Sequence, residues 1–155
     1  MALWDEAEGN NIIRRHAERE GPLLPILHDI QATFGCIPPA AVRFVAEALN
    51  LTRAEVHGVV SFYHDFRHAP PGRNVVRLCR AESCQAMGAI ALADHARKRL
   101  GIDFNATSAD GTFTLEPVYC LGNCACSPAV VINGELLGRV TPARFDDAIA
   151  RLVRR

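Results

Sequence analysis

Residues 75–84 read VVRLCRAESC and residues 112–124 read TFTLEPVYCLGNC. In each segment a run rich in β-branched and aromatic residues, typical of a β-strand, leads into two cysteines. The four cysteines are Cys79, Cys84, Cys120 and Cys124. Each pair therefore lies where strand backbone gives way to a loop, and four thiolates from two loops can surround one centre. The spacing predicts a metal site.

Four thiolates at these spacings suit more than one kind of centre. A [2Fe–2S] cluster takes four cysteine ligands, and structural zinc also accepts cysteine pairs separated by two to four residues. A thioredoxin-type dithiol requires C-x-x-C at the start of a helix, and the sequence has none. Spacing alone therefore leaves iron–sulfur and zinc open.

Residues near the cysteines predict how a negative centre would be stabilised. Gly122 beside Cys120 and Gly88 near Cys84 allow backbone N–H groups to turn inward. Arg80 is a candidate source of positive charge, together with the start of the helix after Cys84.

The chain outside the cysteine loops predicts an α/β fold in two parts. Residues 75–155 give a strand, a helix over 85–100, further strands with a hairpin at Asn133-Gly134, and a last helix from Thr141-Pro142. Residues 1–66 have helical periodicity in four segments, the last opened by a capping box over 52–55. The Pro- and Gly-rich segment 67–74 is predicted to be the linker between the two domains.

Composition limits the function classes. Lysine plus arginine number 17 and aspartate plus glutamate 17, so no net charge favours nucleic acid or anionic lipid. No stretch approaches the roughly 18–20 apolar residues of a membrane span, and the acidic N-terminus does not resemble a secretory signal. We therefore expect a cytoplasmic protein, in which the six cysteines stay reduced and metal binding is the first explanation to test.

Taken together, these segments resemble a known family, the thioredoxin-like [2Fe–2S] subunit of NADH dehydrogenase (complex I) and its relatives in NAD-linked formate dehydrogenases and bidirectional hydrogenases. The resemblance rests on GCIP at 35–38, VSFY at 60–63, the two cysteine pairs, and Pro128 with the AVVING run. It implies iron rather than zinc, with the [2Fe–2S] cluster on the four cysteines. It also implies an N-terminal four-helix bundle, a thioredoxin-like domain, and a flavoprotein partner that binds FMN, NAD(H) and a [4Fe–4S] cluster.

Within that family, SCQAMGA at 83–89 and the short chain resemble the gamma subunit of soluble, molybdenum-containing, NAD-dependent formate dehydrogenase most. We therefore expect a non-catalytic electron-transfer subunit that assembles with the flavoprotein and a larger molybdenum-containing catalytic subunit. The absence of a GxGxxG motif, a phosphate-binding loop and a Ser/His/Asp set agrees with a nucleotide bound by a partner. The alternatives are the equivalent subunit of complex I or of a bidirectional hydrogenase, and, in a different class, a zinc-stabilised adaptor without redox activity.

Other residues with reactive or aromatic side chains are expected to have structural or interface roles. Cys126 is expected to be an inert thiol, with a reserve ligand as the alternative, and Cys36 is expected to pack in the core. Three histidines near the fourth helix are expected to be exposed or at an interface: His57, His64 and His68. Three aromatic residues are assigned either to the core or to a docking patch: Phe62, Tyr63 and Phe66.

Overall fold

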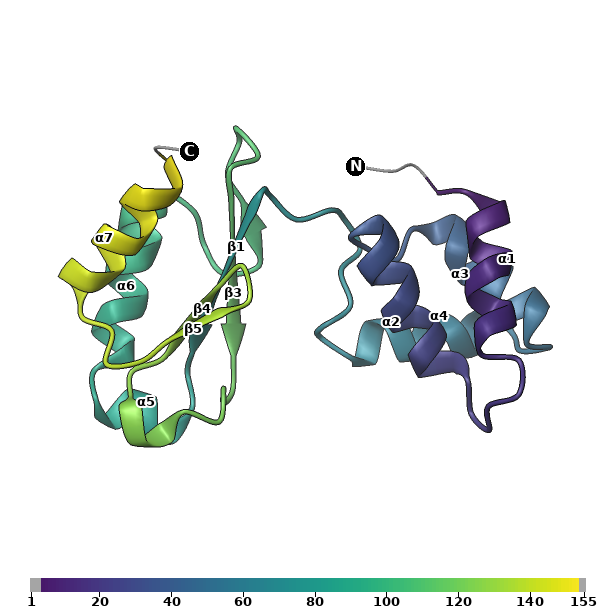
Figure 1. Cartoon of the computed structure of the whole chain (residues 1–155), viewed down its shortest axis with the longest axis horizontal. Coiled ribbons are helices and arrows are strands. Elements are labelled where there is room, and N and C mark those ends of the chain that lie inside the picture. Colours follow the sequence, from purple (N-terminus) through teal and green to yellow (C-terminus); the bar gives the residue numbers. More distant parts are fainter. Residues whose placement is uncertain (1–3, 154–155) are drawn as a thin grey trace. The chain divides into compact units, whose positions relative to one another are not determined.

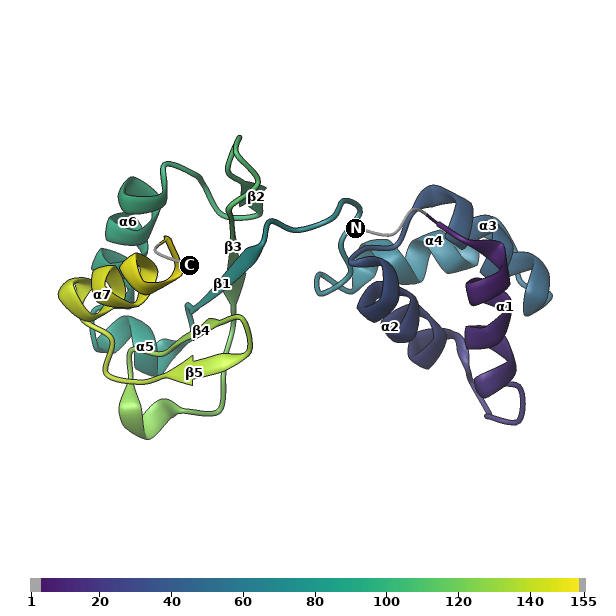
Figure 2. The same ribbon diagram turned by 45° about the horizontal axis from the view of Figure 1, so that its top comes forward.

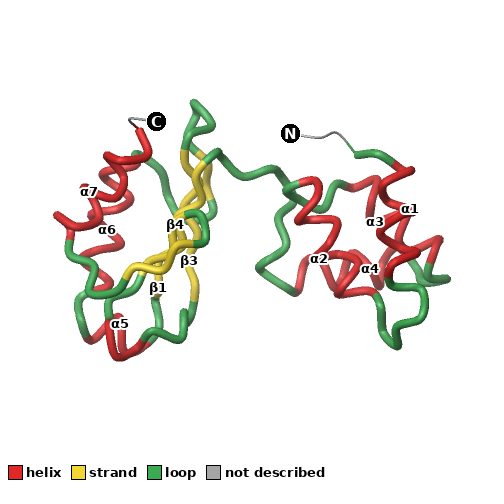
Figure 3. The backbone as a smooth tube through the Cα atoms, viewed as in Figure 1, coloured by secondary structure: helices red, strands yellow, loops and turns green. Residues whose placement is uncertain are grey.

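The structure, a computed structural model, describes residues 4–153 and divides the chain into two compact units, 1–70 and 71–155 (Figure 1). The described part of the first unit is helical, and the strands belong to the second (Figure 3). The α/β fold class predicted from the sequence is confirmed. The outer ends of the two predicted domains, residues 1–3 and 154–155, lie outside the described residues.

Helix boundaries in the first unit follow from local capping chemistry. Its helices are α1 (Glu6–Arg15), α2 (Leu23–Phe34), α3 (Pro39–Ala48) and α4 (Arg53–Phe62). Gly35, at φ 82°, ends α2 in the left-handed conformation. At the start of α4, Thr52 N donates to Glu55 Oε2 at 2.7 Å and Glu55 N donates to Thr52 Oγ1 at 3.2 Å. The predicted capping box is therefore confirmed.

The first unit packs around an aliphatic core contributed by all four of these helices. Its fully buried members include Ile12, Ile26, Leu27, Ile30, Val45 and Val56. The buried amide of Gln31 fixes the segment after α4, because its Nε2 donates to Asp65 O and its Oε1 accepts from Arg67 N, both at 2.7 Å. Arg67 O in turn accepts from Ile37 N at 2.8 Å, so the chain after α4 is held against the start of α3.

The second unit is built on a mixed five-stranded sheet in the order β2-β3-β1-β4-β5. The strands are β1 (Asn74–Cys79), β2 (Ala106–Thr107), β3 (Phe113–Val118), β4 (Val130–Ile132) and β5 (Glu135–Leu137). β1 and β3 are parallel, with Cys79 beside Val118, and the remaining pairings are antiparallel. The carboxyl ends of β1 and β3 therefore meet at one edge of the sheet, where both cysteine loops begin.

Helices α6 (Ala89–Leu100) and α7 (Pro142–Val153) lie together on one side of this sheet (Figures 1 and 2). Buried side chains of alternate strand residues, such as Val76 and Leu78, pack with Leu92 of α6 and Phe145 of α7. The predicted cap of the last helix is present, since Arg144 N donates to Thr141 Oγ1 at 3.2 Å. Both residues of the predicted Asn133-Gly134 turn have positive φ, as a tight hairpin requires.

The structure corrects one predicted helix. The helix expected over residues 85–100 is two helices, α5 (Glu82–Ala86) and α6, separated at Gly88, whose φ is 92°. Cys84 therefore lies inside a short helix instead of in the loop before one. Among residues 4–153, no helix combines the length and apolar character that a membrane crossing requires.

Candidate metal centre

The first cysteine pair is held at the end of β1 and in α5. Cys79 and Cys84 are 1% and 2% exposed and pack with Ala89 and Ala129. Cys79 N donates to Ala129 O at 3.1 Å, which ties this end of β1 to the segment entering β4. The backbone N–H groups of Ala81 and Leu121 hydrogen-bond the Cys79 sulfur. Because Leu121 lies in the second cysteine loop, the two loops are in direct contact.

The two buried thiols differ in how readily they ionise. Burial raises the pKa of the Cys79 thiol, and the neighbouring Cys84 raises it further. Burial also opposes ionisation of Cys84, but hydrogen bonds from Ser127, Cys79 and the Ala129 N–H outweigh it and lower the Cys84 pKa. Within this pair Cys84 is therefore the thiol that ionises first, as a metal ligand must.

The second pair lies on the loop between β3 and β4 and is exposed. The sulfurs of Cys120 and Cys124 are 3.8 Å apart. Cys120 has a φ of 132°, and Gly122 N donates to its sulfur at 3.3 Å, so the predicted inward-turned N–H is present. Cys120 raises the pKa of the Cys124 thiol, and the charge of Cys84 adds to this effect. Cys84 and Cys124 therefore lie within electrostatic range of each other.

The four sulfurs are arranged as two pairs. Among residues 4–153, no three histidine, cysteine or carboxylate side chains gather as a site for one metal ion would require. Four cysteine thiols with backbone N–H donors beside them have the chemistry that a binuclear centre with negative charge needs. The donor set thus fits a [2Fe–2S] cluster.

Two serines that the sequence-based prediction did not single out connect the pairs. Ser127 Oγ lies 3.4 Å from Cys84 Sγ and donates to Cys124 O at 2.9 Å. Ser83 Oγ lies 2.9 Å from Ser127 Oγ and donates to Cys124 O at 3.2 Å. In the sequence, these serines could have been found only by their position beside the cysteines: Ser83 directly precedes Cys84, and Ser127 lies three residues after Cys124.

Cys126 and Arg80 have contacts that bear on their predicted roles. Cys126 shares a single 3₁₀ turn with Cys124, η1 (Cys124–Cys126), and is partly buried. The Arg80 guanidinium lies 5.0 Å from the centre of the Phe104 ring, a cation–π contact. Its charge is therefore fixed over an aromatic ring, and Arg80 N donates to Val118 O at 2.7 Å.

The Cys36 thiol is buried, and burial raises its pKa, as expected for a packed and unreactive cysteine.

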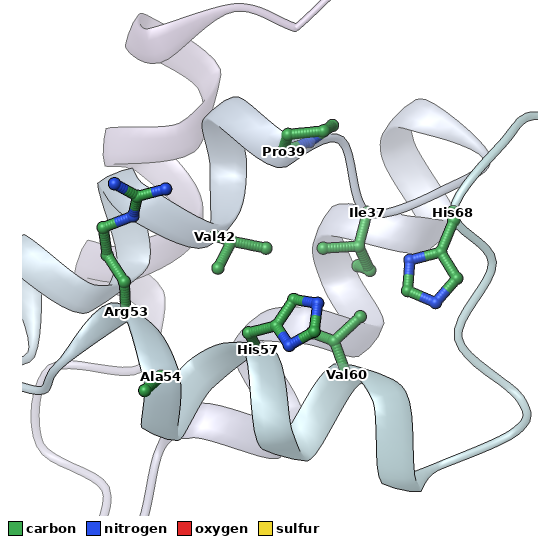
Figure 4. A pocket seen from close by; sticks show the side chains of 8 residues that line it. All are labelled: Ile37, Pro39, Val42, Arg53, Ala54, His57, Val60 and His68. Carbon is green, nitrogen blue, oxygen red and sulfur yellow. The ribbon is translucent and has the colours of Figure 1, made fainter.

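The first unit contains a hollow of about 520 Å³ between the start of α3, the outer face of α4 and His68 (Figure 4). Buried Ile37 and Val60 lie beneath it, and Arg53, His57 and His68 surround it without an acidic lining residue. Arg53 and His57, four residues apart on α4, project from one helix face. The lining of the hollow is mostly apolar, with one guanidinium and two imidazoles among its side chains.

The aromatic residues at the end of α4 divide between core and surface. Phe66 is 4% exposed and belongs to the core, whereas Phe62 is 73% and Tyr63 44% exposed. The Tyr63 ring stands edge-on to both phenylalanines, at 5.3 Å from Phe62 and 6.2 Å from Phe66. The core assignment is therefore confirmed for Phe66, and the docking patch stays a prediction for Phe62 and Tyr63.

Comparison with known proteins relates the chain to redox subunits. The sequence model of the thioredoxin-like [2Fe-2S] ferredoxin family matches residues 9–153. An NADH-quinone oxidoreductase subunit of Mycobacterium bovis is 37% identical over 137 residues, which cover 88% of this chain and 54% of that protein. The chain thus spans about half the length of the mycobacterial relatives it matches.

Two further proteins cover a similar part of the chain. The NADP-reducing hydrogenase subunit HndA of Solidesulfovibrio fructosivorans is 33% identical over 133 residues, 86% of this chain and 78% of that protein. The crystal structure of an NAD+-reducing [NiFe]-hydrogenase in the H2-reduced state aligns with a TM-score of 0.74 and 26% identity. That alignment covers 86% of this chain and 22% of the hydrogenase chain.

Proposed function

The chain belongs to the thioredoxin-like [2Fe–2S] ferredoxin family, and from this premise we propose that it is an electron-transfer subunit of an NADH-linked oxidoreductase. The family carries one [2Fe–2S] cluster, and we assign its ligands in this chain to Cys79, Cys84, Cys120 and Cys124. The observation that carries the assignment is the contact between the two cysteine segments: Ser127 Oγ lies 3.4 Å from Cys84 Sγ, and Ser83 Oγ donates to Cys124 O at 3.2 Å.

The residues of this chain prepare the site in three ways. The lowered pKa of Cys84 favours ionisation of one thiol in the buried pair. Backbone N–H groups of Ala81, Leu121, Ala129 and Gly122 donate to three of the four sulfurs and offset the negative charge of the thiolates. When bound, the cluster takes up and releases one electron. The exposed pair, Cys120 and Cys124, marks the side from which a redox partner approaches most closely.

The proposed partner is a flavoprotein subunit that binds FMN, NAD(H) and a [4Fe–4S] cluster. Support comes from the relatives, whose names are those of NADH-quinone oxidoreductase and NADP-reducing hydrogenase subunits. The sequence agrees, because it contains no nucleotide-binding glycine motif of its own. Six free cysteines also suit a reducing compartment, and we place the assembly in the cytoplasm.

The kind of complex is a finer proposal. The relatives favour a subunit of complex I or of an NAD(P)-linked hydrogenase. Formate dehydrogenase, with a molybdenum-containing catalytic subunit, rests on the SCQAMGA segment at 83–89. Co-purification of the tagged chain from its native cell, followed by metal analysis, separates them. Nickel indicates a hydrogenase, molybdenum a formate dehydrogenase, and quinone-linked membrane subunits complex I.

The cluster itself is tested on the full chain reconstituted anaerobically with iron and sulfide. We expect two irons and two labile sulfides per chain and an S = 1/2 EPR signal that appears on reduction. For four-cysteine ligation the midpoint potential should be low, on the order of −400 mV. A colourless protein with one tightly bound zinc per chain would contradict the proposal and support a zinc-stabilised adaptor instead.

A further inference from the structure

Ser127 occupies a central position between the two cysteine loops. It is only 6% exposed, and its hydroxyl is in hydrogen-bond contact with Cys84 Sγ, Cys124 O and Ser83 Oγ. Cys84 and Ser83 belong to α5, and Cys124 belongs to the second cysteine loop. One buried side chain therefore joins both halves of the candidate metal centre.

Once Cys84 is a metal ligand, its sulfur is a thiolate. The number of serine hydroxyl protons then determines which hydrogen bonds Ser127 can donate. A thiolate sulfur accepts hydrogen bonds and donates none. Ser127 and Ser83 supply one hydroxyl proton each, and the acceptors are Cys84 Sγ, Cys124 O and the other serine oxygen. Ser127 Oγ also lies 2.9 Å from Cys124 O, so its one proton goes either to that carbonyl or to the Cys84 sulfur. When Ser83 donates its own proton to Cys124 O, at 3.2 Å, the carbonyl is satisfied and the Ser127 proton is available to the Cys84 sulfur.

We propose that Ser127, oriented by Ser83, is a positioning residue that raises the reduction potential of the cluster by donating a hydrogen bond to Cys84 Sγ. This inference rests on the function proposed above. Reduction adds one electron, and hence one negative charge, to a centre that is already anionic, and a donor to a ligand sulfur favours that state. Burial strengthens the effect, because a hydrogen bond in a low-dielectric site is screened little by water.

The hydroxyl differs from the other donors in this site. The Ala81, Leu121 and Ala129 donors are backbone N–H groups, which any residue except proline would supply at those positions. The Ser127 donor depends on a side chain and disappears when that side chain changes. Ser127 is thus a position at which the potential is set by sequence while the fold stays the same.

The test compares midpoint potentials by EPR-monitored redox titration of the full reconstituted chain. Ser127→Ala should lower the equilibrium constant for one-electron reduction roughly tenfold, a shift of about 59 mV to more negative potential. Ser83→Ala, which frees the Ser127 hydroxyl to turn toward Cys124 O, should shift the potential less and in the same direction. Ser127→Thr retains a hydroxyl and should keep the wild-type potential.

Two further measurements distinguish tuning from simple support of the fold. In D₂O the reduced wild-type protein should show an exchangeable deuteron coupled to the cluster that Ser127→Ala lacks. Ser61→Ala removes a hydroxyl whose hydrogen bonds within the described residues are to its own helix, at His57 O and Gly58 O, and should leave the potential unchanged.

The outcomes separate the two proposals. If wild-type chain takes up no [2Fe–2S] cluster, the proposed function fails first. If it does, and Ser127→Ala retains both the wild-type potential and the deuteron coupling, this inference alone is wrong. A loss of iron with an unchanged potential in the loaded fraction also overturns it. Should Ser127→Ala fail to load, Ser83→Ala decides, since an unshifted potential there excludes the proposed orientation.

Discussion

A Cβ atom at Gly138 would lie 2.7 Å from the Cβ of Cys126 and 2.9 Å from its carbonyl oxygen, closer than such atoms pack. The same oxygen accepts a hydrogen bond from Arg139 N at 2.6 Å. The loop that follows β5 therefore lies directly on the turn that carries Cys124 and Cys126. Glycine at 138 is required by this close approach, and the second cysteine loop depends on it for its position.

Gly138→Ala should accordingly displace the turn and weaken the metal centre. We expect a loss of about 1–3 kcal/mol in the free energy of unfolding, as for overpacked sites, and fewer irons retained per chain. Urea denaturation and iron analysis measure the two effects. Gly58→Ala is the matched control, because nothing lies within 4 Å of an added Cβ there. In the interior of α4 it should stabilise by about 0.5–1 kcal/mol. Equal behaviour of the two variants would contradict the steric argument.

Asp110 should titrate at unusually low pH. Its carboxylate accepts hydrogen bonds from the Ser108 and Thr112 hydroxyls, at 2.5 Å each, and from Thr112 N at 3.0 Å. These bonds lower its pKa from 3.8 to about 2. A depressed folded-state pKa stabilises the fold above the unfolded pKa, and this contribution is lost as pH falls through the interval from 3.8 to about 2.

NMR titration of the Asp110 carboxyl carbon measures this directly. Ser108→Ala removes the hydroxyl that contributes most and should bring the midpoint back toward the ordinary aspartate value. A wild-type midpoint near 3.8 would show that the turn between β2 and β3 does not hold the carboxylate in this geometry.

The two cysteine pairs, the capping box at Thr52 and the Asn133-Gly134 turn were all predictable, because each is a local pattern whose chemistry acts over a few residues. The break between α5 and α6 was not, since the apolar spacing continues through Gly88 and only the backbone conformation ends the helix. Ser127 escaped for another reason. Its contact with Cys84 spans 43 residues and exists only because β1 lies between β3 and β4.

The same limit applies to the aromatic residues at and after the end of α4, which periodicity could not divide between core and surface. Phe66→Ala should destabilise the first unit by about 3–5 kcal/mol, because it empties a buried site. Phe62→Ala, at 73% exposure, should change the free energy of unfolding by no more than about 0.5 kcal/mol. Thermal unfolding measures both variants. A large loss in Phe62→Ala would mean that its ring is buried in solution.

The ligand assignment is tested by serine substitutions that differ in position but not in chemistry. Cys84→Ser should abolish most cluster occupancy and destabilise the second unit, because ligand binding there contributes to folding. Cys36→Ser, in the first unit, should retain full iron content, and so should Cys126→Ser if Cys126 is an inert thiol. Iron per chain and the visible absorption of the reconstituted protein report the result. If Cys84→Ser kept its iron while Cys126→Ser lost it, the ligand set would include Cys126 in place of Cys84. The two-pair geometry would then have to change, since Cys126 shares a turn with Cys124 while Cys84 is the buried neighbour of Cys79.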